Sequence, residues 1–387
     1  MEISREELRA FPRTWKSTAL GIKIHNRKYQ QKLINEVTQL FIESLMRFSP
    51  KKLLTKEREC VREKGFRKYL ATRKADATGI DFSVGAVKDF ERNLKKKRNK
   101  LDSVNVDALR EYIDQLIEDG KNSEERFIAI ARYFFHIKKY DLYIYLASIL
   151  GATNVIPEIG ERIASIAGEE IRRKTYEGID FPPLGTPQDE YPIVAKKILE
   201  RMEAELPPGK CREVMTWNYH QVPASEFKEA KNRFEKSTSI DRYLENEHKR
   251  LVDELQSCMK KGQPWFEQEI TPEVLEFVKN NQEINTGIRR GKTIFKTKIP
   301  YAPKQFLKEK DPAMKKYYAC HCQLVRTALR NGDPKISPTF CYCSAGFEKL
   351  PFDIIFEENV EVEVLETLLS GDPCCRFAIK IPKGKMK

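Results

Sequence analysis

The feature that most constrains the fold is a change of hydrophobic periodicity near residue 290. Before it, apolar residues recur at helical spacing, as in residues 27–48. After it, residues 292–299 (KTIFKTKI) alternate, and so do residues 360–364 and 376–381 on either side of a Ser-Gly-Asp turn. Alternation around such a turn is typical of an antiparallel hairpin. The sequence therefore predicts an α+β protein, with a helical N-terminal region followed by a mixed α/β module that ends in an antiparallel β-hairpin.

Capping residues and helix breakers divide the chain further. Ser83 and Ser123 are candidate N-caps, Gly151 is a candidate stop, and Thr271-Pro272 marks another helix start. The proline-rich stretch 179–192 cannot sustain a helix and is the clearest linker. From these signals we expect several short helices within 103–178 and further helices at 190–205, 225–236, 239–260, 272–283, 312–329 and 338–350.

Positive charge is concentrated at the N-terminus. Residues 1–100 contain 26 Lys and Arg against 12 Asp and Glu, whereas the remainder is close to neutral. This contrast predicts a basic helical region at 1–100, a helical bundle at 101–180 and an α/β ligand-binding module at 190–387. The run Lys95–Arg98 is either a solvated helix end or a phosphate-binding strip. Nucleic acid is therefore an alternative partner, less favoured because no binding motif accompanies the charge.

No secretory signal and no apolar run of membrane-spanning length is visible, so we expect a cytoplasmic protein with no membrane contact. A homodimer is compatible with the sequence. In a reducing compartment the nine cysteines are not expected to form a disulfide framework. Six of them fall within residues 320–375, as two C-x-C pairs and one adjacent pair. Core packing, a metal site and thiol chemistry remain as three explanations.

Periodicity limits how many of these cysteines converge. Two residues spaced i, i+2 on a helix point about 200° apart, so each C-x-C pair contributes one inward thiol at most. If 312–329 and 338–350 are helices, His321, Cys343 and Cys375 face inward, with Cys322 at the edge of the cluster. Three cysteines and one histidine form a ligand set that zinc accepts, and we take Cys343, Cys375 and His321 as the candidate metal ligands. The same proximity of thiol and imidazole suits thiol catalysis.

Further candidates surround the cysteines. Glu348 is a candidate acid or base beside the catalytic candidates His321 and Cys343, although an exposed glutamate is the ordinary alternative. Trp217 and His220 lie in a loop that forms either a pocket wall or a packed corner. The candidate ligand-binding residues are Cys322, Phe340, Phe347, Trp217 and His220.

The C-terminal stretch also resembles known families. Residues 337–347 (SPTFCYCSAGF), 360–364 and 371–377 (GDPCCRF) are similar to the end of the 4-vinyl reductase small-molecule-binding domain. They also resemble the bacterial L-2-amino-thiazoline-4-carboxylic acid hydrolase-like family. The resemblance covers about residues 285–382 and implies a prokaryotic α/β module that binds a small organic molecule, in some members with a zinc ion held by cysteines and a glutamate.

Matched residue by residue, Cys375 corresponds to the cysteine after the Gly-Asp turn, and Cys341 or Cys343 to the helix cysteine. Thr367 and Val364 stand where the resemblance implies a cysteine and a glutamate. We therefore expect a pocket walled by the cysteine helices and the terminal hairpin in preference to a zinc site. The expected function is small-molecule binding, with hydrolysis or thiol chemistry as a further activity. The alternative is a non-enzymatic sensor or adaptor whose basic N-terminal region contacts nucleic acid or an acidic partner.

Overall fold

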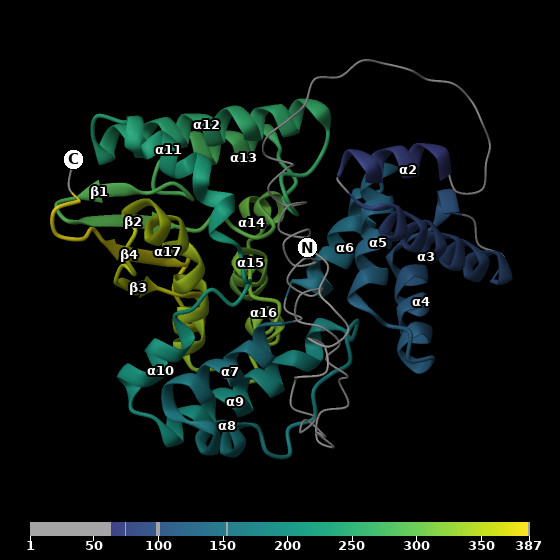
Figure 1. The fold of residues 1–387 in the computed structure, drawn as a ribbon, viewed down its shortest axis with the longest axis horizontal. Helices are drawn as coiled ribbons and strands as arrows, with labels where there is room; N and C mark the ends of the chain where they lie inside the picture. Colours follow the sequence, from purple (N-terminus) through teal and green to yellow (C-terminus); the bar gives the residue numbers. More distant parts are fainter. Residues whose placement is uncertain (1–62, 74, 98–100, 152–153, 386–387) are drawn as a thin grey trace, which may run out of the picture.

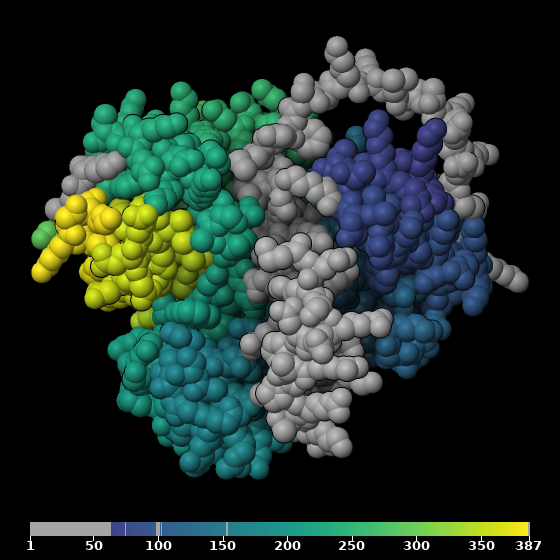
Figure 2. All heavy atoms as spheres, viewed as in Figure 1, coloured from purple at the N-terminus to yellow at the C-terminus, as the bar shows by residue number. Residues whose placement is uncertain are grey.

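The computed structural model describes residues 63–73, 75–97, 101–151 and 154–385. The predicted helix at 27–48 and most of the basic region 1–100 lie outside these residues. Within them, a series of helices precedes a small antiparallel sheet, so the predicted α+β class is confirmed (Figure 1). In the space-filling view the C-terminal strands lie on the side of the molecule opposite the N-terminal helices (Figure 2).

The N-terminal helices enclose a core of their own. Ser123 caps its helix as expected, because its hydroxyl accepts from the Arg126 amide. Ser83 does not: it is buried inside a helix whose N-cap is Asp76, the side chain of which accepts from Gly79 N at 2.8 Å. These helices are α2 (Glu63–Thr72), α3 (Ala77–Lys96), α4 (Val106–Glu118), α5 (Glu124–His136) and α6 (Tyr140–Leu150).

A second group of helices follows on either side of the proline-rich linker. Its core is shared with the C-terminal part of the chain, since Ile159 and Ile198 pack in one cluster with Leu324 and Phe340. The group comprises α7 (Val155–Ala167), α8 (Glu169–Tyr176), α9 (Tyr191–Glu205) and α10 (Pro208–Met215). The cysteine segments are therefore anchored on residues that precede them by more than a hundred positions.

The next helices lead to the sheet. The Thr271 hydroxyl accepts from Val274 N, and Pro272 occupies the first turn, as predicted. These helices are α11 (Lys228–Lys236), α12 (Ile240–Lys261), α13 (Pro272–Lys279) and α14 (Pro303–Lys308).

Four antiparallel strands form the sheet, in the order β1-β2-β4-β3. They are β1 (Ile288–Arg290), β2 (Thr293–Thr297), β3 (Val362–Glu366) and β4 (Arg376–Lys380). The pairing of β3 with β4 confirms the predicted terminal hairpin. Ile294 and Ile379, paired across β2 and β4, point into a core with Phe352 of α17 (Tyr342–Phe356), and this core also includes residues of α11 and α12.

The predicted helix at 312–329 is wrong in its middle. The chain forms α15 (Pro312–Ala319) and α16 (Arg326–Asn331), separated by a non-helical segment. The reason lies in the backbone: the carbonyls of Tyr318 and Ala319 accept from Ala302 N (2.8 Å) and Tyr301 N (3.2 Å) instead of continuing the helix. The expected helix at 338–350 begins with a 3₁₀ turn, Pro338–Cys341, and continues as α17.

Among the residues that the structure describes, one stretch, Tyr140–Ala167, is long and apolar enough by composition to cross a membrane. It spans α6 and α7, and half of its apolar window is buried inside the protein. The expected absence of membrane contact stays a prediction.

Candidate functional site

Two lysines on β2 and at its end point toward α17 and share one carboxylate. Lys296 lies on the sheet face that also carries Ile294, and the spacing of two places Lys298 on the same side. Their ammonium nitrogens lie 2.7 Å and 3.4 Å from the carboxylate of Glu348, a residue of α17 that is 3% exposed. The sheet and its covering helix are therefore joined by a buried group of charges with two cations and one anion.

This environment decides what Glu348 can do. Burial alone would raise the pKa of its carboxyl, but Lys296 and Lys298 outweigh burial and lower the pKa to about 2. The alternative prediction, that Glu348 is an ordinary exposed glutamate, is wrong because the residue is buried. A carboxylate that stays ionised at neutral pH and is held by two ammonium groups cannot act as a general acid there. The arrangement favours a structural role for Glu348.

Aromatic and hydroxyl groups complete the surroundings of Lys298. Its ammonium donates to the Ser344 hydroxyl at 3.0 Å and lies 5.6 Å from the centre of the Phe347 ring. The His220 ring meets Phe347 edge to face at 5.3 Å. Dense packing and the charge of Lys298 lower the pKa of His220 to about 4, although the residue keeps a solvent-exposed side. The structure thus brings His220 and Phe347 together beside Lys298, a residue that was not among the candidates predicted from the sequence.

Gly346 determines how the 217–220 segment reaches α17. A β-carbon at this position would lie 2.5 Å from both the backbone nitrogen and the carbonyl oxygen of Trp217. No side chain fits such a gap, so glycine is required for the two backbones to touch. The Trp217 side chain itself is 45% exposed, with Arg162 stacked 4.0 Å above its ring. The segment is a packed corner with an exposed aromatic surface.

His321 lies in the break between α15 and α16. Its Nε2 is 2.6 Å from the carbonyl oxygen of Ile299, and its ring packs edge to face on Tyr301 at 5.5 Å. Burial and the charge of Lys298 lower the pKa of His321 to about 3. The imidazole is therefore neutral at pH 7 and hydrogen-bonded through Nε2.

The eight cysteines in the described residues are free thiols. Burial raises the pKa of Cys320 and of Cys343 to about 12, and burial also raises the pKa of Cys375. Burial and the neighbouring thiols hold the pKa of Cys322 and Cys341 well above the usual range. Thiols with raised pKa values stay protonated at neutral pH and are poor nucleophiles. The predicted catalytic role of Cys343 receives no support from its surroundings.

The proposed zinc ligands do not assemble. In the described ranges, no three His, Cys, Asp or Glu side chains are placed to hold a metal ion. His321 uses Nε2 on a backbone carbonyl, and the break after Ala319 removes the helical geometry that aimed it at Cys343. Cys375 immediately precedes β4 and packs against the core that contains Cys320 and Cys343. These thiols are core side chains, which is the commonest state of reduced cysteine.

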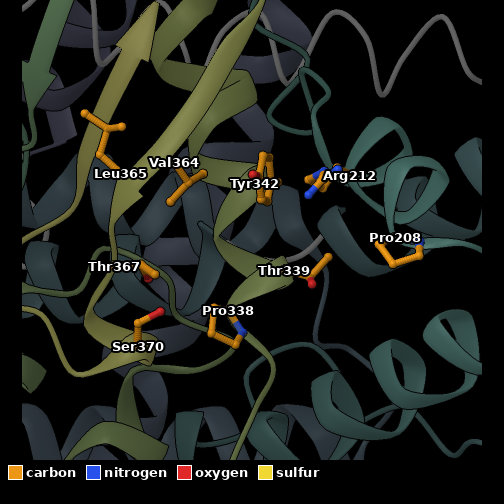
Figure 3. A pocket seen from close by; sticks show the side chains of 9 residues that line it. All are labelled: Pro208, Arg212, Pro338, Thr339, Tyr342, Val364, Leu365, Thr367 and Ser370. Atoms are coloured by element: carbon orange, nitrogen blue, oxygen red, sulfur yellow. The ribbon is translucent and has the colours of Figure 1, made fainter.

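A surface pocket opens beside this core, with a volume of about 260 Å³ (Figure 3). Its walls are α10, the 3₁₀ turn that leads into α17, and the end of the terminal hairpin, the last two being elements where the sequence predicted a pocket. The lining residues are Pro208, Arg212, Pro338, Thr339, Tyr342, Val364, Leu365, Thr367 and Ser370.

The strand β3 contributes two residues to one wall of this pocket. The pairing of β3 with β4 shifts between Val364 and Glu366, next to this wall. Val364 and Leu365 both border the pocket, with their side chains on opposite sides of the strand (Figure 3). Val364 is half-buried and Leu365 is 38% exposed, so β3 forms the outer edge of the pocket.

Arg212 supplies a positive charge to this pocket. No ion pair or hydrogen bond of its guanidinium occurs with any residue that the structure describes. Hydroxyl groups of Thr339 and Ser370 line the same space. The Thr367 hydroxyl is already engaged, because it donates to the Cys341 sulfur at 2.6 Å and accepts from Leu369 N. The Thr339 hydroxyl accepts from the Ser337 hydroxyl at 3.1 Å and can still donate. The pocket therefore offers one cation, hydroxyl groups and apolar walls.

The sequence-predicted ligand-binding residues are not the ones that line this pocket. Phe340 is 2% exposed inside the core, and Cys322 packs against the same core. Sequence reasoning missed Arg212 because it stands singly on a short helix, without a pattern. A signal for Lys296 and Lys298 was present: two lysines fall on the buried face of an alternating strand, where apolar residues are the rule.

Comparison with known proteins adds one match. A model of a family of unknown function (DUF6144) matches residues 273–386. No curated protein and no solved structure matches the chain. The matched region contains the lysine pair, α17 and the terminal hairpin. The resemblance to the 4-vinyl reductase domain and to the thiazoline hydrolase-like family stays a prediction.

Proposed function

We propose that this protein binds a small organic anion in the pocket between α10 and the terminal hairpin. The observation that carries the proposal is the Arg212 guanidinium on the wall of a pocket of about 260 Å³, which forms no ion pair with any described residue. An arginine with no carboxylate partner among the described residues is suited to pair with a carboxylate from outside, in a two-pronged geometry.

The remaining walls support a ligand with an apolar body. Leu365, Val364 and the two prolines offer apolar surface, and Thr339 and Ser370 offer hydroxyls that can donate or accept. Ligand sites commonly combine apolar walls with a few polar groups that fix orientation. The volume suits a molecule of about the size of a substituted aromatic acid or a short-chain fatty acid.

Binding without catalysis is the function that the surroundings favour. The thiols near the pocket have raised pKa values, Glu348 is held between two lysines, and His321 is hydrogen-bonded to a backbone carbonyl. None of these groups lines the pocket. Hydrolysis and thiol chemistry stay predictions with no support from these groups, and so does nucleic-acid binding, since most of the basic region lies outside the described residues.

The test uses thermal unfolding and calorimetry with a panel of aromatic and short-chain aliphatic monocarboxylates. We expect at least one to stabilise the wild-type protein, and Arg212→Gln to weaken its binding roughly tenfold or more. Arg242→Gln, which removes an exposed arginine on α12 outside this pocket, is the matched control and should bind as the wild type does. An undiminished response in Arg212→Gln, or no response to any carboxylate in the wild type, would contradict the proposal.

A further inference from the structure

A buried arginine at the break between α15 and α16 forms no ion pair with any residue that the structure describes. Arg326 is 4% exposed, and its guanidinium lies between two aromatic rings, 4.1 Å from the centre of Tyr301 and 4.2 Å from that of Tyr317. Its Nε is buried without a hydrogen bond, and no ion pair or side-chain hydrogen bond of this residue is found in the described ranges. Arginine cannot shed its charge by deprotonation, so the positive charge is buried without an ion-pair partner among the described residues.

Stacking on tyrosine accounts for only part of this arrangement. Cation–π attraction satisfies the faces of the guanidinium, but its N–H groups point along the plane and need acceptors. The carboxylate of Glu267 accepts from the Tyr301 hydroxyl and does not form an ion pair with Arg326. Burial raises the pKa of Glu267 to about 7, so this group is only partly ionised at neutral pH. The guanidinium edge therefore has no hydrogen-bond acceptor among the described residues.

A second unsatisfied group lies three residues away. The Gln323 side chain is 6% exposed, and its Oε1 has no hydrogen-bond donor. The Tyr301 hydroxyl uses its single hydrogen on Glu267, so the Gln323 amide must turn its NH₂ group toward that hydroxyl. This fixes the amide orientation and leaves Oε1 as a buried acceptor. Buried orphan groups are rare in folded proteins and call for a ligand, a water or an ion.

We propose that Arg326 and Gln323 form a second binding site, selective for a small oxyanion that also carries a hydrogen-bond donor. Hydrogen phosphate is the simplest member of this class. Its charged oxygens would accept from the Arg326 guanidinium, and its O–H would donate to Gln323 Oε1. Sulfate has the same shape but no O–H at neutral pH, so the orphan acceptor should discriminate against it.

A bound anion at this site would also influence contacts between α16 and distant parts of the chain. The Thr327 hydroxyl donates to the carbonyl of Gln188, and the Gln188 amide donates to the carbonyl of Ser148 in α6. Arg330 pairs with Asp189 at 2.6 Å. The start of α16 therefore connects the N-terminal helices to the C-terminal part, and neutralising Arg326 should stabilise this junction.

The experiment measures binding of inorganic phosphate and of sulfate to the full-length protein by calorimetry, at matched ionic strength. We expect the wild type to bind phosphate more tightly than sulfate, and Arg326→Met to weaken phosphate binding about tenfold or more. Equal phosphate binding by wild type and Arg326→Met would overturn the proposal. If Arg326→Met does not fold, Arg326→Lys serves instead, because lysine keeps the charge but cannot bind in a two-pronged manner. Phosphate binding by that variant at wild-type strength would overturn the proposal equally.

Three further variants assign the roles. Gln323→Met should narrow the preference for phosphate over sulfate, and an unchanged ratio would refute the role of the orphan acceptor. Arg242→Gln, at an exposed arginine on α12 that belongs to neither site, should bind phosphate as the wild type does. Loss of phosphate binding in Arg212→Gln, with retention in the Arg326 variants, would place the anion in the α10 pocket and overturn the inference.

Discussion

At the scale of single residues, Gly346 and Lys298 determine more of the contacts around the candidate site than the cysteines do. Gly346 lets two backbones meet, and Lys298 gathers Ser344, Glu348 and Phe347 around one ammonium group. The six C-terminal cysteines are buried or half-buried thiols that stay protonated at neutral pH. Residue type alone was therefore a poor guide to which positions organise the site.

Gly346→Ala tests the backbone contact. The added methyl would meet the Trp217 backbone at 2.5 Å, and backbone cannot yield as a flexible side chain can. We expect a loss of roughly 1–3 kcal/mol in the free energy of unfolding, measured by urea denaturation.

Gly85→Ala is the matched control, because Gly85 lies inside α3 and nothing stands within 4 Å of the added methyl. That substitution should stabilise by roughly 0.5–1 kcal/mol. Equal effects of the two substitutions would show that the Trp217 contact is unimportant.

At the scale of elements, β2 and α17 are joined by charge as well as by apolar packing. Glu348→Gln would leave Lys296 and Lys298 buried without their counter-charge. Breaking a buried pair by removing one partner typically destabilises by roughly 3–5 kcal/mol. We expect a loss of that order in chemical denaturation, whereas Glu361→Gln, at an exposed position before β3, should change stability by no more than about 0.5 kcal/mol. A Glu348→Gln protein as stable as the wild type would contradict this account.

Elements with strong local patterns could be predicted from the sequence, and those set by distant contacts could not. The alternation of apolar residues was sufficient to predict β2 and the terminal hairpin, and Thr271-Pro272 was sufficient to predict the start of α13. The break after Ala319 depends on hydrogen bonds from residues 301 and 302, which periodicity does not reveal. The pocket was expected between the cysteine helices and the hairpin, but part of its lining, including Arg212, comes from α10.

At the scale of the whole molecule, His321, His220 and Glu348 make stability dependent on pH in two overlapping windows. The pKa of His321 is lowered to about 3 and that of His220 to about 4, from an ordinary value of 6.5. For these two groups the unfolded chain binds more protons, so their contribution to stability falls as the pH drops below about 6.5. Burial raises the pKa of Glu124, Glu254 and Glu267 to about 7, and these three groups act in the opposite direction between about pH 7 and pH 4.5. Glu348, with its pKa lowered from 4.5 to about 2, should contribute a further loss only below about pH 4.5.

Thermal unfolding of the full-length protein from pH 7.5 to pH 3 checks this order. In His321→Gln, where an amide can still donate to the Ile299 carbonyl, stability at pH 4.5 relative to pH 6.5 should be higher than in the wild type. Glu348→Gln should keep the wild-type change between pH 6.5 and 4.5 and lose the further decline at lower pH. A His321→Gln profile parallel to the wild type throughout would show that this imidazole is not responsible.

The close contact of Gly346 with Trp217 also affects what can be inferred about other proteins that share the matched region. Gly346 belongs to the region matched by the family of unknown function, whereas Trp217 and the pocket residue Arg212 come from outside it. The matched region is thus completed by a stretch of chain that other proteins sharing it need not possess. In such proteins, ligand preference would depend on both the matched region and the segment that contains Arg212 and Trp217. A ligand identified for one protein should therefore be assigned only to chains that contain both.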